Sequence, residues 1–143
     1  MNICIIEDQP KFKVQEAINY LKEKKIKFNY IIFKNSSSAL QYLMTNLSNI
    51  NLIILDLGLP KLDNGIYYNK YEGLFILNKI LSKTKKIPII INSTTAIHTE
   101  DCTSEKEYFK NLSPAIVEHI DRLTGYYLYE FIKIYLDDKI EFL

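Results

Sequence analysis

The sequence predicts a doubly wound α/β domain built on a five-stranded parallel sheet. Short apolar runs alternate five times with amphipathic stretches along the 143 residues. The apolar runs are mostly continuous and aliphatic, which is typical of parallel strands covered by helices on both faces. Right-handed crossovers between such strands place the helices on the two sides of the sheet. No repeat or low-complexity linker interrupts the pattern, so we expect a single domain over residues 1–143.

Five runs rich in β-branched or other apolar residues predict the strands. They are Asn2–Ile6, Phe28–Phe33, Leu52–Leu55, Ile89–Ile91 and Ala115–His119. Pro88 precedes the fourth run, a position at which a strand tolerates the missing N–H group.

Five stretches with apolar residues at helical spacing predict the helices. They are Lys11–Lys25, the residues around Leu40, Leu43, Met44 and Leu47, those around Leu74, Leu77, Ile80 and Leu81, the weaker pattern Glu100–Leu112, and the stretch with Leu128, Phe131, Ile132, Tyr135 and Leu136. Ser36 or Ser37 is the expected N-cap of the second helix.

Charge, apolar run lengths and cysteine content narrow the functional classes. Eighteen basic and seventeen acidic residues leave a formal charge of +1, so no direct nucleic-acid binding is expected. No apolar run approaches the length of a membrane span, and the N-terminus lacks the basic flank of a signal peptide. Cys4 and Cys102 form no disulfide framework. We therefore expect a cytoplasmic protein.

Acidic and hydroxyl side chains follow three of the predicted strands. Glu7 and Asp8 follow the first strand, Asp56 follows the third, and Ser93 follows the fourth. In open parallel sheets the functional site lies at the carboxyl ends of the strands. If the first, third and fourth strands are neighbours, these side chains converge at one edge of the sheet.

Such a set of carboxylates predicts a site for a hard divalent cation. Three clustered carboxylates repel one another, and at least one would hold a proton unless a cation offset the charge. Oxygen ligands without His or Cys favour Mg²⁺ over zinc.

Four segments, Ile5–Asp8, Leu52–Pro60, Glu72–Leu74 and Ile87–Ser93, resemble the receiver domains of response regulators in two-component signalling, and the resemblance covers nearly the whole chain. Ile5–Asp8 resembles the acidic pair that closes the first strand of those domains. Leu52–Pro60 resembles their phosphoacceptor segment, with Pro four residues after the Asp. Glu72–Leu74 resembles the start of their third helix, and Ile87–Ser93 resembles their fourth strand.

The resemblance implies a fold, a cofactor and a role for each residue that matches. The fold would be flavodoxin-like, with strand order 2-1-3-4-5. Asp56 would accept the phosphoryl group, and Glu7, Asp8 and the carbonyl of Gly58 would hold Mg²⁺ together with Asp56. Ser93 would form a hydrogen bond with the phosphoryl group.

The chain departs from the receiver pattern in three places. Receiver domains keep a Lys at the end of the fifth strand, and no Lys occurs here; His119 is the nearest candidate. Ile116 stands where those domains often have an aromatic residue. The segment Lys61–Tyr71 is longer than the corresponding loop.

The implied function is a phosphorylation-dependent switch in a phosphorelay. It would receive phosphate from a histidine kinase or phosphotransfer protein and act on an unidentified output protein. Its only catalysis would be its own phosphorylation and dephosphorylation. The alternative is a receiver-like interaction module that does not use phosphorylation, which the missing Lys favours. An enzyme of similar fold is disfavoured, because a haloacid-dehalogenase phosphatase would usually have Asp where Gly58 stands, and the acidic Glu7–Pro10 segment would repel a phosphate-bearing cofactor.

Overall fold

A computed structural model describes the whole chain except residues 11–12, 63–69, 93–115, 121–124 and 141–143. The elements run in the order β1 (Asn2–Ile6), α1 (Lys13–Glu23), β2 (Asn29–Phe33), α2 (Ser36–Asn46), the 3₁₀ turn η1 (Leu47–Asn49), β3 (Leu52–Leu55), α3 (Lys70–Lys83), β4 (Ile89–Asn92), β5 (Ile116–Ile120) and α5 (Gly125–Ile140).

The five strands form one parallel sheet in the order β2-β1-β3-β4-β5, which confirms the predicted order 2-1-3-4-5. Ile6 of β1 lies opposite Leu55 of β3, which in turn lies opposite Ile91 of β4. The carboxyl ends of β1, β3 and β4 therefore meet at the same edge of the sheet.

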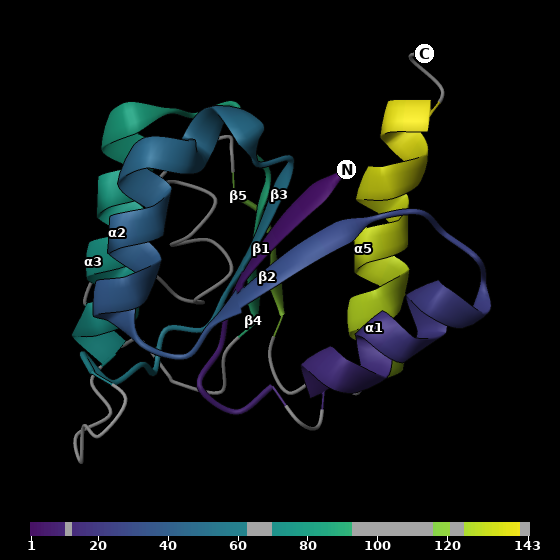
Figure 1. Cartoon of the computed structure of the whole chain (residues 1–143), viewed down its shortest axis with the longest axis horizontal. Coiled ribbons are helices and arrows are strands. Elements are labelled where there is room, and N and C mark those ends of the chain that lie inside the picture. The colour runs from purple at the N-terminus through teal and green to yellow at the C-terminus, as the bar shows by residue number, and fades with distance from the viewer. Residues whose placement is uncertain (11–12, 63–69, 93–115, 121–124, 141–143) are drawn as a thin grey trace, which may run out of the picture.

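Helices cover both faces of the sheet (Figure 1), with α2 and α3 on one side and α1 and α5 on the other. Alternate strand residues divide accordingly between two apolar cores. Ile6, Leu55 and Ile91 belong to the core with α2 and α3. Ile5, Ile54 and Ile90 belong to the core with α1 and α5. This alternation fixes which side chains at the strand ends share a face.

The N-cap of α2 differs from the serine expected from the sequence. Asn35 is the capping residue, and its side-chain oxygen accepts a hydrogen bond of 2.8 Å from the backbone N–H of Ser38. Asn caps a helix as well as Ser does, so the local pattern could not decide between neighbouring positions. The hydroxyl of Ser36 instead donates a hydrogen bond to Glu72 of α3.

The predicted strands agree with the structure to within one residue at the ends that the structure describes. β4 extends one residue further than predicted, to Asn92, and β5 runs from Ile116 to Ile120. The predicted helix Glu100–Leu112 lies outside the described residues. Within the described part of the chain, no helix has both the length and the apolar character to cross a membrane.

Candidate metal and phosphoacceptor site

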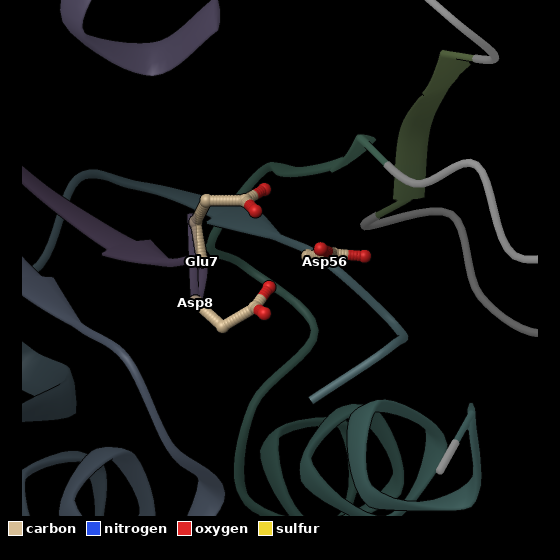
Figure 2. Close-up of side chains that lie close together, drawn as sticks. All are labelled: Glu7, Asp8 and Asp56. Carbon is tan, nitrogen blue, oxygen red and sulfur yellow. The ribbon is translucent and has the colours of Figure 1, made fainter. Parts of the chain in front are cut away.

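Three carboxylates converge at the carboxyl ends of β1 and β3 (Figure 2). Hydrogen bonds of 2.9 Å continue the sheet ladder one residue past each strand, from Glu7 N–H to the Phe33 carbonyl and from Asp56 N–H to the Ile6 carbonyl. The backbones of Glu7 and Asp56 are therefore held side by side. Carboxylate oxygens of Glu7, Asp8 and Asp56 lie within 4.8 Å of one another, and all three residues are half-buried.

This crowding changes the protonation of Glu7. Its burial, followed by the nearby charge of Asp56, raises the pKa of Glu7 from 4.5 to about 9. A hydrogen bond of 3.2 Å from Gln9 N–H to Glu7 Oε1 lowers the pKa of Glu7, but its effect is smaller than those of burial and Asp56. At neutral pH Glu7 therefore retains a proton in the metal-free protein. The donor set consists only of oxygen atoms, which suits a hard divalent cation, and such a cation would compete with that proton.

The loop after Asp56 is fixed by its own side chains. Leu57 and Leu59 are fully buried in the core beneath α2 and α3. The Gly58 N–H donates a hydrogen bond of 3.1 Å to Asp56 Oδ1. Because the two leucines anchor the loop on either side of Gly58, this bond holds the Asp56 carboxylate in a defined orientation.

The helices on this face attach to the same loop. Ser36 N–H at the start of α2 donates to the Pro60 carbonyl over 2.9 Å. Gly73 N–H in α3 donates to the Leu57 carbonyl over 3.1 Å. The hydroxyl of Ser36 donates to Glu72 Oε2 over 2.6 Å and so links α2 to α3.

Gly73 allows α3 to lie directly against this loop. A Cβ atom at position 73 would clash with the Leu57 Cα and would come within 2.7 Å of the Leu57 carbonyl carbon. No side chain fits in that space without moving the backbone next to Asp56.

The structure thus brings together four of the predicted site residues: Glu7, Asp8, Asp56 and, through its backbone N–H, Gly58. The backbone of His119 lies in β5 opposite Ile91, one position before the level of Asp56. Ser93 lies outside the described residues, so its place at the site stays a prediction.

No pattern in the sequence assigns a role to Asn92, the last residue of β4. It is only 4% exposed, and it follows three buried isoleucines. The sequence does show a polar residue directly after three isoleucines, but a polar residue at a predicted strand end is ordinarily exposed to solvent. Only the structure shows that it is buried.

No family model matches the sequence, and no curated protein matches it either. Solved structures do match. A response regulator receiver domain protein from Clostridium thermocellum is 19% identical, with a TM-score of 0.65 over 99% of this chain and 98% of the other. The Mn²⁺-bound form of response regulator Rcp1 is 23% identical, with a TM-score of 0.60 over 95% and 89% of the two chains.

A third match is the phosphorylated cyanobacterial phytochrome response regulator RcpA, which is 21% identical with a TM-score of 0.61 over 92% of this chain and 88% of that one. These likenesses show that the chain has the fold of response-regulator receiver domains, which agrees with the resemblance found in the sequence.

Proposed function

We propose that this chain, which has the receiver-domain fold, is a phosphorylation-dependent signalling switch with Asp56 as the phosphoacceptor. The observation that carries the proposal is the cluster of Glu7, Asp8 and Asp56, whose carboxylate oxygens lie within 4.8 Å of one another at the carboxyl ends of β1 and β3. That is the edge at which ligands bind in open parallel sheets.

Glu7, Asp8, Asp56 and the carbonyl of Gly58 would hold Mg²⁺. The oxygen-only donor set favours a hard divalent cation at this position, and binding would displace the proton that the raised pKa of Glu7 retains at neutral pH. Response regulator Rcp1, which has the same fold, has been solved in an Mn²⁺-bound form, and this supports a divalent ion in the present chain. When bound, Mg²⁺ would offset the negative charge of the carboxylates and of the incoming phosphoryl group.

Asp56 would attack the phosphorus atom of a phosphohistidine on a histidine kinase or phosphotransfer protein. The new bond joins a carboxylate oxygen of Asp56 to phosphorus. The phosphorus–nitrogen bond breaks, and the leaving imidazole nitrogen keeps the electron pair. The hydrogen bond from Gly58 N–H fixes the carboxylate before the reaction, and positioning of this kind supplies much of the rate in phosphoryl transfer.

We assign two further roles to residues around the phosphoryl group. Ser93 would form a hydrogen bond with it, and His119 would stand in for the Lys that receiver domains keep at the end of the fifth strand. Phosphorylation would favour one of two conformations and so change the surface offered to an output protein in the cytoplasm.

Intact-mass spectrometry after incubation with acetyl phosphate and Mg²⁺ tests the proposal. The wild-type protein should gain the mass of one phosphoryl group. Asp56→Asn should gain none, because a side-chain amide does not attack the phosphorus atom of the donor. Gly58→Ala serves as the control variant. It should still be labelled, because it keeps the backbone N–H that donates to Asp56. Labelling that persists in Asp56→Asn would contradict the assignment.

A second candidate function is a receiver-like interaction module that does not use phosphate. The specific observation in its favour is that the segment Ala115–Ile120 contains no Lys. Under this hypothesis the wild-type protein would bind Mg²⁺ but would show no phosphodonor-dependent mass gain.

A further inference from the structure

Asn92 combines a polar side chain with almost complete burial. It ends β4 and is only 4% exposed, whereas the three residues before it in the strand are buried isoleucines. A buried amide is costly unless its N–H and C=O groups find partners. Its position relative to the acidic cluster therefore matters.

The sheet register puts Asn92 level with the acidic cluster. Ile6, Leu55 and Ile91 lie opposite one another on adjacent strands, so the next residues form a row of Glu7, Asp56 and Asn92. Neighbouring strands are about 4.8 Å apart, which brings the Asn92 amide within reach of a group attached to Asp56.

Strand alternation places these residues on one face of the sheet. Ile5, Ile54 and Ile90 precede Glu7, Asp56 and Asn92 by two positions each, and all three isoleucines pack in the core with α1 and α5. Asn92 thus shares its face with the two carboxylates instead of pointing toward α2 and α3.

The Asn92 side chain forms no hydrogen bond with any other residue in the described part of the chain. Asn35 provides the contrast, because it is also 4% exposed but its side-chain oxygen accepts a hydrogen bond from Ser38 N–H. Among the described residues, one buried asparagine is therefore satisfied by the fold, and the other has two N–H donors without a partner at the level of Asp56.

We propose that the Asn92 amide donates a hydrogen bond to the phosphoryl group on Asp56. This inference rests on the proposed function. Phosphoryl oxygens only accept hydrogen bonds, so they complement the side-chain N–H₂ group of Asn92. In a chain without the Lys at the end of the fifth strand, this donor holds the phosphoryl group without contributing a positive charge.

Equilibrium binding of beryllofluoride, a phosphoryl analogue, in the presence of Mg²⁺ tests the proposal, with fluorine NMR as the readout on the full chain. Asn92→Leu keeps the side-chain volume and removes the donors. It should bind beryllofluoride roughly tenfold or more weakly than the wild type, because a hydrogen bond to a charged group is lost. Its Mg²⁺ affinity should be unchanged.

Thermal unfolding without ligand supplies a second readout with a matched control. Asn92→Leu should raise the unfolding midpoint because the amide that it removes has no hydrogen-bond partner among the described residues. Asn35→Leu, at an equally buried position, should lower the midpoint because it removes the cap of α2. A lower midpoint in Asn92→Leu would mean that the amide has a structural partner, and it would overturn the proposal.

The remaining outcomes separate this proposal from the one on which it rests. Asn92→Asp keeps the shape and loses both donors, so it should also bind beryllofluoride weakly. Wild-type binding in either variant would refute the role of Asn92 and leave Asp56 as phosphoacceptor. A sharp loss of Mg²⁺ affinity in Asn92→Leu would make Asn92 a metal ligand instead of a donor. A wild-type protein that binds Mg²⁺ but neither beryllofluoride nor a phosphoryl group would overturn both proposals.

Discussion

At the scale of single residues, the burial of Glu7 changes the pH at which its carboxyl group ionises. Its carboxyl group shares a confined space with Asp56, and burial together with that negative charge raises its pKa to about 9. The folded metal-free protein therefore holds a proton that the unfolded chain, with an ordinary Glu, gives up near pH 4.5. Because the folded state binds the extra proton, stability from this group is complete below the unfolded pKa and declines as the pH rises toward the folded pKa.

The first consequence is a pH dependence of stability in the metal-free protein. From about pH 7 to about pH 8.5, above the ordinary pKa of His, the unfolding midpoint should fall. Glu7→Gln should flatten this dependence because it cannot ionise. Thermal unfolding of the wild type and of Glu7→Gln, each with a chelator present, measures the two pH dependences. A midpoint that stays constant or rises in the wild type over this interval would contradict a protonated Glu7 at neutral pH.

The same proton couples Mg²⁺ binding to pH. If Glu7 must ionise to bind the cation, Mg²⁺ affinity should increase about tenfold per pH unit between about pH 7 and 8. Titration calorimetry in buffers of different ionisation enthalpy should detect one proton released per ion. Asp8→Ala keeps the Glu7 proton but removes a ligand, so its affinity should be lower at every pH. An affinity independent of pH in the wild type would remove Glu7 from the site.

At the scale of elements, a backbone hydrogen bond joins α3 to the loop that follows β3. Gly73 lets the helix backbone approach Leu57, the residue after Asp56, and its N–H donates to the Leu57 carbonyl. A second glycine, Gly125, has the same kind of contact on the other face, where a Cβ would lie 2.7 Å from the Lys13 carbonyl oxygen of α1. The two positions permit a matched comparison.

Gly73→Ala should destabilise the protein by about 1–3 kcal/mol, because the clash with Leu57 exceeds the helix propensity gained from Ala. It should also slow labelling by acetyl phosphate, since the displaced loop carries Asp56. Gly125→Ala should destabilise the protein to a similar extent but leave the labelling rate of the folded fraction unchanged. Denaturant unfolding and time-resolved intact-mass spectrometry provide the two measurements. Equal labelling rates in the two variants would show that α3 does not position Asp56.

At the scale of the whole molecule, the strands could be predicted because aliphatic runs and helical spacing are local signals, whereas their order was implied by the resemblance to receiver domains. The convergence of Glu7, Asp8 and Asp56 followed from that order, since parallel strands present their carboxyl ends at one edge. The burial of Asn92 at the level of the acidic cluster could not be predicted in this way. It depends on the register between β3 and β4 and on burial by distant residues, and neither is encoded near position 92.

Two other features also depended on tertiary contacts. Asn35 caps α2, and the Ser36 hydroxyl binds Glu72, which is 36 residues away in sequence. The level of His119 relative to Asp56 follows from a register shift between Ile89 and Ile90 in the pairing of β4 with β5, which the apolar pattern of the strands does not reveal.

Under the proposed function, Asp56 forms an acyl phosphate in a reaction that requires a divalent cation. Borohydride reduction tests it most directly, because it converts an aspartyl phosphate into homoserine and so marks the residue in a peptide map. After incubation with acetyl phosphate and Mg²⁺, we expect homoserine at position 56, and none when a chelator replaces Mg²⁺. Homoserine at another aspartate would contradict the assignment of Asp56, and equal conversion with the chelator would contradict the need for a divalent cation.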